Sequence, residues 1–179
     1  LANRYQNEPT VLGYVLLQGL GGADPTTLTS FVTDMGKLLR VAAPRQLVSL
    51  DLTWEGADGA ANYRALQELP VVDLIDVDDY QFEKSLQPVD PALLETLASI
   101  AKPTVVGEAA FLLDGDDAAA LVRRADKARE RLASYKQWGF SGALLWAYQP
   151  SWSAVSEEFD ARPADPLLQP GGVVASAPW

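Results

Sequence analysis

Histidine and cysteine are both absent from the 179 residues of this chain. Without cysteine, the chain has no disulfide framework and no thiolate metal site. Without histidine, it has no Ser-His-Asp triad, no zinc-binding histidine motif and no imidazole base. Any general acid or base must therefore be a carboxylic acid, a tyrosine or a lysine. From the residues we expect no cofactor and no metal ion.

Positive charge is also scarce, since 14 Lys and Arg residues face 24 Asp and Glu residues and leave a net charge of -10. An acidic surface repels phosphate backbones and anionic lipids, so nucleic acids and membrane surfaces are not expected as partners. No apolar run has the length of a membrane span. Hydrophobic residues make up 48% of the chain, which predicts a globular domain. A neutral ligand such as a sugar is compatible with this charge.

Short apolar segments alternate with amphipathic ones along the chain. Strands are predicted over residues 11–17, 46–53, 71–77, 103–107 and 141–148. Helices are predicted over residues 26–40, 60–69, 91–101, 116–138 and 153–159. Asp24 or Thr26 is expected to cap the first helix, and Asp90 the third. The predicted domains are residues 1–160 and a Pro- and Gly-rich tail, 161–179, packed on the surface.

This alternation predicts an α/β fold in which helices cover a parallel sheet. An open doubly wound sheet and part of a closed barrel both fit the pattern. Gly19-Leu20-Gly21-Gly22 follows the first strand but is not the GxGxxG turn of nucleotide-binding folds, and no P-loop is present. The residues alone leave both architectures open and slightly favour the barrel.

Polar and aromatic side chains gather where the predicted strands end, which is the functional face of a parallel barrel. Carboxylates there provide acid–base chemistry for glycosidic bonds, and aromatic faces stack on sugar rings. The sequence therefore predicts a carbohydrate site. Its candidate residues are Gln18, Trp54, Glu55, Asp78, Tyr80, Glu108 and Trp146.

Several motifs follow one another in a specific order. Lys102-Pro103-Thr104-Val105-Val106-Gly107-Glu108 has the form KPxxxGE, and Gly139-Phe140-Ser141-Gly142-Ala143 precedes Trp146. Asn3-Arg4-Tyr5, then Glu8-Pro9-Thr10-Val11, lie ahead of the first strand, and Asp165-Pro166-Leu167 follows the last. From residue 3 to residue 168 the sequence resembles the cellulase and mannanase group of glycoside hydrolases, typified by glycoside hydrolase family 5 of clan A. The resemblance implies a (β/α)8 TIM barrel of which this chain supplies strands four to eight.

The resemblance also implies roles for the candidate residues. Glu108 takes the place of the nucleophile of a retaining hydrolase of β-linked carbohydrate, and Trp146 that of the Trp that floors the sugar subsite. Tyr80 matches the Tyr that follows the sixth strand. Asp78 stands where the family usually has a His. The family favours an extracellular or cell-envelope location.

The chain departs from the family at the second carboxylate. Gln18 stands in place of the Asn that ends the fourth strand, and Gly19 in place of the acid/base Glu. Asn7-Glu8-Pro9 copies the family tripeptide but precedes the strand, which puts Glu8 at the opposite end of the barrel. Glu55, just past the next strand, is the candidate for a relocated acid. The alternative is an inactive pseudoenzyme that binds carbohydrate or acts as a structural or interaction subunit.

A complete barrel needs about 250 residues, so the first three strand–helix units are not among these 179. They are supplied by a second chain or an upstream segment, or the chain pairs with a copy of itself, or residues 161–179 cover an edge of a smaller sheet. The first two are favoured because the segment 11–17 is too apolar for a solvent-exposed edge. Asp73, Asp76, Asp78 and Asp79 do not indicate a metal site, because alternate residues of a strand point to opposite faces.

Overall fold

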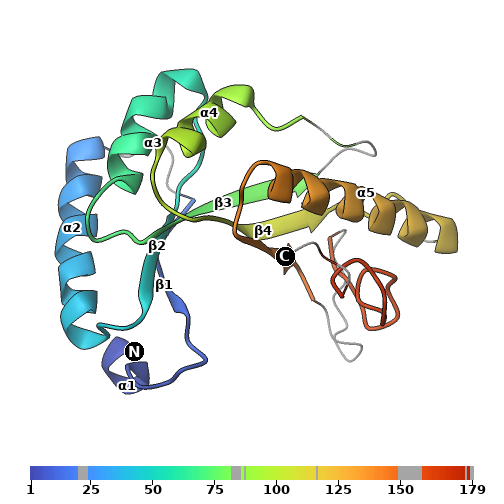
Figure 1. The fold of residues 1–179 in the computed structure, drawn as a ribbon, viewed down its shortest axis with the longest axis horizontal. Coiled ribbons are helices and arrows are strands. Elements are labelled where there is room, and N and C mark those ends of the chain that lie inside the picture. Colours follow the sequence, from blue (N-terminus) through green and yellow to red (C-terminus); the bar gives the residue numbers. More distant parts are fainter. Residues whose placement is uncertain are drawn as a thin grey trace. The chain divides into compact units, whose positions relative to one another are not determined.

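The computed structural model describes residues 1–19, 24–81, 86, 88–115, 117–148, 159–175 and 177. Their strands form a sheet in the order β1-β2-β3-β4-β5, and Figure 1 labels β1 to β4. The strands are β1 (Gly13–Gln18), β2 (Leu47–Asp51), β3 (Leu74–Gln81), β4 (Thr104–Phe111) and β5 (Gly142–Trp146). β1 pairs in parallel with β2, β2 with β3, and β4 with β5. The predicted α/β class, with parallel strands that alternate with helices, is confirmed.

The structure describes five α-helices, of which three begin after a capping aspartate. They are α1 (Ala2–Tyr5), α2 (Pro25–Ala42), α3 (Ala60–Gln67), α4 (Pro91–Ser99) and α5 (Ala118–Gln137), with a 3-10 turn η1 (Ala57–Gly59) before α3. Asp24, Asp90 and Asp117 each accept a hydrogen bond from a backbone N–H of the first turn. In the described ranges no helix is long and apolar enough to cross a membrane. The helix predicted at 153–159 lies outside the described residues except for Phe159.

The chain divides into two compact units. The first contains Leu1–Val77 and Val89–Thr104, and the second contains Asp78–Pro88 and Val105–Trp179. The division falls within β3 and at the first residue of β4. The domain boundary predicted at residue 160 stays a prediction.

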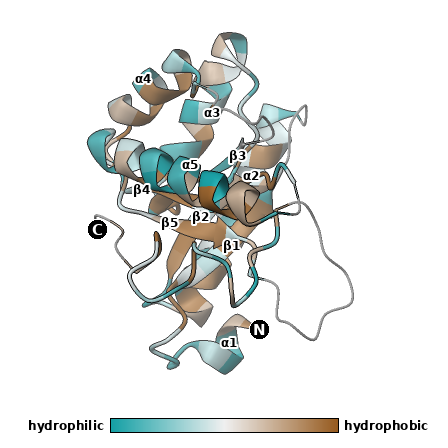
Figure 2. Cartoon of the chain, turned by 90° about the vertical axis from the view of Figure 1, so that its right-hand side faces the viewer, coloured by the Kyte–Doolittle hydropathy of each residue, from teal (hydrophilic) through white to brown (hydrophobic). Residues whose placement is uncertain are grey.

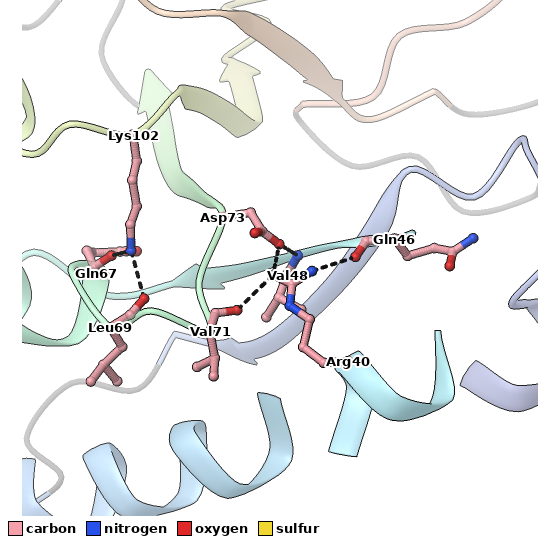
Figure 3. Close-up of polar contacts among 8 residues, drawn as sticks. All are labelled: Arg40, Gln46, Val48, Gln67, Leu69, Val71, Asp73 and Lys102. Carbon is pink, nitrogen blue, oxygen red and sulfur yellow. Dashed lines mark hydrogen bonds and ion pairs between the residues drawn. The ribbon is translucent and has the colours of Figure 1, made fainter. Parts of the chain in front are cut away.

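A polar cluster connects α2, β2 and the segment before β3 in the first unit (Figure 3). Arg40, near the end of α2, forms an ion pair with Asp73 and donates to the carbonyl oxygen of Val71, 3.3 Å away. The Asp73 carboxylate also accepts from the backbone N–H of Val48 at 2.7 Å. Asp73 therefore joins α2, β2 and the approach to β3, which is a structural role.

Lys102 performs a similar task in the same unit (Figure 3). Its ammonium group donates to the carbonyl oxygens of Gln67 and Leu69, the latter at 2.8 Å. These carbonyls lie at and just beyond the end of α3, where helix carbonyls lack intrahelical partners. Burial lowers the pKa of Lys102. The lysine of the KPxxxGE motif thus anchors α3 ahead of β4.

The second unit is built around α5. One side of this helix buries Ala120, Ala128, Leu132 and Tyr135, and the hydropathy colouring of Figure 2 shows teal segments along the helix against brown strands. Arg124 is buried on α5 and forms an ion pair with Asp165 of the C-terminal segment. Leu167 and Val173 of that segment are buried as well.

Two predicted strands end too early. β4 continues from Gly107 to Phe111, because Ala109, Ala110 and Phe111 are all buried and extend the apolar strand. β3 begins only at Leu74, because Val72 before it donates to the carbonyl oxygen of Leu69 in a turn. The strand then continues past Val77 to Gln81. Asp78, Tyr80 and Glu108 therefore lie within strands, whereas the sequence placed them just beyond strand ends.

Candidate functional site

The second unit brings two of the predicted site residues into direct contact. The hydroxyl of Tyr80, on β3, donates a hydrogen bond to the carboxylate of Glu108, on β4. Both side chains are half-buried. The Tyr80 ring packs edge-on against Phe159, with 5.4 Å between ring centroids. The phenol and the carboxylate thus hold each other in fixed orientations, because a hydrogen bond to an ionised group is strong and directional.

An irregularity in β4 decides which way Glu108 points. Val106 pairs with Ala143, and Ala109 pairs with Leu145, so three steps along β4 match two along β5. Ala143, Leu145 and Ala109 all line a cavity on the α5 side. Because side chains alternate along a regular strand, the extra residue lets Val106 and Ala109 share the α5 side while Glu108 turns toward Tyr80.

That cavity has a volume of about 120 Å³ and lies between α5, β4, β5 and the C-terminal segment. Its lining is made of alanine, leucine and valine side chains, among them Leu132, Leu167 and Val173. Among the described residues no carboxylate lines it, and an apolar lining lacks the acid–base groups of a sugar-hydrolysing site.

Trp146 is the last residue of β5 and is 41% exposed. Its register partner is Ala110, two residues past Glu108 on the neighbouring strand. The peptide bond between Trp146 and Ala147 is cis. An exposed indole on the strand next to the Tyr80–Glu108 pair provides a flat apolar surface of the kind on which sugar rings stack.

Asp79 faces the opposite side of β3 from Tyr80. Its carboxylate accepts from the Tyr135 hydroxyl at 2.6 Å and forms an ion pair with Arg131 at 3.2 Å, both on α5. Burial, together with the charge of Asp79, raises the pKa of the Tyr135 phenol far above its usual value. Asp79 therefore fastens β3 to α5.

In the first unit, Trp54 and Glu55 lie in the loop after β2. The indole N–H of Trp54 donates to the Asp90 carboxylate at 2.7 Å, and its ring packs edge-on against Tyr63. The hydrogen bond from Trp54, with one from the Ala92 backbone, lowers the pKa of Asp90. The exposed Glu55 lies close to Gly59. A Cβ added to Gly59 would come within 2.8 Å of the Glu55 Cβ. Trp54 is thus tied to the start of α4.

In the same unit, Gln18 ends β1 and Gly19 follows it. Gln18 is exposed and is the register partner of Asp51 on β2. Gly19 has a φ of 67° and donates its backbone N–H to the carbonyl oxygen of Asp51 at 3.1 Å. Glu8 lies ahead of β1 and accepts two hydrogen bonds from Thr10, chiefly from its hydroxyl, and these lower the pKa of Glu8.

A carboxyl pair that the sequence did not suggest lies on β2 and β3. Asp51 and Asp76 are register partners on these adjacent parallel strands, with exposures of only 5% and 8%. Register partners in a parallel sheet project to the same face. Asp51 lies in a segment predicted only as an apolar strand, and the pairing register that places it opposite Asp76 is not visible in the sequence.

Comparisons with known proteins were made on sequence and on structure. No protein-family model and no curated protein sequence matches the chain. A glycoside hydrolase family 5 mannosidase from Rhizomucor miehei has a similar structure, with a TM-score of 0.67 and 14% identity over 92% of this chain and 50% of the mannosidase. The chain has the fold of half a TIM-barrel glycoside hydrolase.

Two xylanases show the same likeness. The intracellular xylanase TsXylA from Thermoanaerobacterium saccharolyticum has a TM-score of 0.62 and 13% identity, over 94% of this chain and 60% of the xylanase. An endo-β-1,4-xylanase of glycoside hydrolase family 10 from Gloeophyllum trabeum has a TM-score of 0.62 and 11% identity, over 86% of this chain and 54% of the enzyme. The structural resemblance to clan A hydrolases and the partial barrel predicted from the sequence are confirmed. The chain spans about half the length of these structures.

Proposed function

We propose that this chain is part of a glycoside hydrolase-like barrel that acts on or binds β-linked carbohydrate, by a retaining mechanism when it hydrolyses. The contact between Tyr80 and Glu108 carries the proposal. It orients one carboxylate on β4, the strand next to the one that ends in the partly exposed Trp146. The resemblance of the fold to a mannosidase and two xylanases agrees with this chemistry.

In a retaining mechanism, Glu108 attacks the anomeric carbon and a second carboxyl group, about 5–5.5 Å away, protonates the leaving oxygen. Water then releases the sugar from Glu108, and the second group acts as the base. Tyr80 fixes the Glu108 carboxylate through its hydroxyl. Gly19 has no titratable group, so the acid is supplied by Glu55 or by a segment outside these residues.

Release of aryl leaving groups tests the nucleophile separately from the acid, because a phenolate leaves with little protonation. We expect slow cleavage of aryl β-glycosides, β-mannoside and β-xyloside among them. Glu108→Gln should lower kcat/KM by about 10³-fold or more, and Tyr80→Phe by roughly 10- to 100-fold through loss of one hydrogen bond to a charged group. Glu95→Gln, an exposed substitution on α4, is the matched control. Full activity in Glu108→Gln would rule the proposal out.

Glu55→Gln then tests the acid. If Glu55 protonates the leaving group, this variant should lose activity on alkyl glycosides and keep most of it on aryl glycosides with acidic phenols. Equal losses on both substrate classes would contradict that role.

The second candidate function is carbohydrate binding without hydrolysis, in an inactive pseudoenzyme or a structural subunit. Gly19 at the end of β1 favours it, because the residue has no side chain with which to transfer a proton. Titration calorimetry with β-linked oligosaccharides distinguishes the two functions. Binding that depends on Trp146 without any turnover would support this second function, and turnover that depends on Glu108 would exclude it.

A further inference from the structure

The apolar cavity of the second unit lies between one side of α5 and the sheet. Ala128 and Leu132, one turn apart on α5, form its wall on the helix side. Ala143 and Leu145, two residues apart on β5, project into it from the sheet, because alternate residues of a strand share a face. The cavity is therefore built into the contact between two elements of regular structure.

The C-terminal segment covers the cavity. Leu167 and Val173 line it and are both buried. The backbone N–H of Val174 donates to the carbonyl oxygen of Leu167 at 3.1 Å, which folds the segment back on itself. The buried ion pair between Arg124 and Asp165 fastens the start of this segment to α5. The cover is thus held in place by contacts of its own.

Small side chains leave the space open. Ala109, Ala128 and Ala143 belong to three different elements and all line the same volume. Protein interiors are close-packed, and voids larger than a water molecule are few. The cavity, at about 120 Å³, is several times larger than the roughly 30 Å³ that one water occupies in the liquid. It therefore has room for a small molecule.

The lining selects the chemistry of that molecule. Among the described residues, no side chain that lines the cavity carries a polar group. A buried water needs about two to four hydrogen bonds, so an apolar cavity of this kind stays dry. Apolar cavities of about 150 Å³ in other proteins take up benzene or xenon. A charged molecule would lose its hydration without replacement.

We propose that this cavity is a binding site for a small uncharged apolar molecule, such as an aromatic ring or a short hydrocarbon. Val174 lines the cavity and is 50% exposed, so the site reaches the surface beside the C-terminal segment. The ligand gains free energy roughly in proportion to the apolar area that it removes from water.

This site is separate from the proposed carbohydrate site. Ala109 lines the cavity on the α5 side of β4, whereas Glu108 turns toward Tyr80 on the other side. A sugar would bury hydroxyl groups against a lining whose side chains offer them no partner, which is unfavourable. The inference therefore does not depend on the proposed function.

Thermal unfolding of the full chain with benzene tests the inference. We expect benzene to raise the Tm by about 2–5 °C when its free concentration is about ten times its Kd. Phenol has the same ring with one hydroxyl group added. It should bind roughly tenfold more weakly or less, because the hydroxyl would be buried without a side-chain partner.

Two substitutions on α5 locate the binding. Ala128→Leu fills the cavity and should remove the response to benzene. Ala133→Leu, the same change at an exposed position of this helix, should keep the response. Circular dichroism first establishes that both variants are folded. Leu132→Ala enlarges the cavity and should bind n-butylbenzene more tightly than the wild type does, which provides a test that does not depend on the folding of Ala128→Leu.

Three results would overturn the inference. An unchanged Tm of the wild type up to the solubility limit of benzene would show that the cavity takes no such ligand. An equal rise in folded Ala128→Leu and in the wild type would place the binding elsewhere. Equal affinities of Leu132→Ala and the wild type for n-butylbenzene would contradict a site bounded by Leu132.

Discussion

The direction of Glu108 depends on one extra residue in β4. Without the irregularity between Val106 and Ala109, alternation would place Glu108 on the α5 side with Val106. There it would meet the apolar cavity lined by Ala143 and Leu145 of β5. The KPxxxGE motif identifies the residue, whereas the irregular pairing of β4 with β5 turns its side chain toward Tyr80 of β3.

The buried phenol of Tyr135 should make the free energy of unfolding depend on pH. Burial raises the pKa of its phenol above the unfolded value of 10.0. A raised pKa in the folded state means that this stabilisation is complete below about pH 10, and is lost as the pH rises from there toward the folded pKa. We expect the free energy of unfolding to fall above about pH 10 and to fall less steeply in Tyr135→Phe.

Urea unfolding between pH 8 and pH 11 measures this difference. Tyr5→Phe is the control, since Tyr5 lies at the surface on α1. Parallel pH profiles for Tyr135→Phe and the wild type would contradict the prediction.

Among the elements, α5 and the C-terminal segment are joined by a buried ion pair. The side chains of Arg124 and Asp165 are almost completely buried. Arg124 also donates to the carbonyl oxygen of Asp160 at 3.0 Å, and Asp165 accepts from the backbone N–H of Leu167 at 2.9 Å. Removal of one partner leaves the other charged and buried, which costs more than the loss of a surface pair.

Arg124→Met should therefore lower the free energy of unfolding by about 3–5 kcal/mol. The double variant Arg124→Met/Asp165→Leu should recover much of that loss, because no isolated charge stays buried. Arg123→Met is the matched control, since the Arg123–Asp114 pair is partly exposed and is expected to contribute about 1 kcal/mol or less. A double variant as unstable as the single one would contradict this explanation.

At the scale of the whole molecule, β1 is an uncharged outer edge among the strands that the structure describes, and such an edge predicts self-association of the chain. Lysine on an edge strand opposes such pairing, because its charge would be desolvated between two strands. We expect wild-type protein to associate as its concentration rises, and Val15→Lys to remain more monomeric in sedimentation velocity. Ala98→Lys, exposed on α4, adds the same charge elsewhere. If both variants reduced association equally, net charge and not the edge would be the cause.

The sequence by itself determined the α/β class, the alternation of the five strands with helices and the helix start at Asp90, and it narrowed the start of α2 to Asp24 or Thr26. These follow from local patterns, because hydrophobic periodicity and N-capping act over a few neighbouring residues. The order of motifs also identified the clan A resemblance of the fold. Strand bounds were less accurate, since β3 and β4 continue past polar residues that the alternation of apolar residues could not include.

Only the tertiary structure decided which side chains meet. It paired Tyr80 with Glu108, tied Trp54 to Asp90 and placed Asp51 opposite Asp76. These contacts depend on the register between strands and on an irregularity in β4, which are set by packing between segments far apart in the chain. The local sequence around each residue does not contain that information, because a shift of one residue in register moves every side chain to the opposite face.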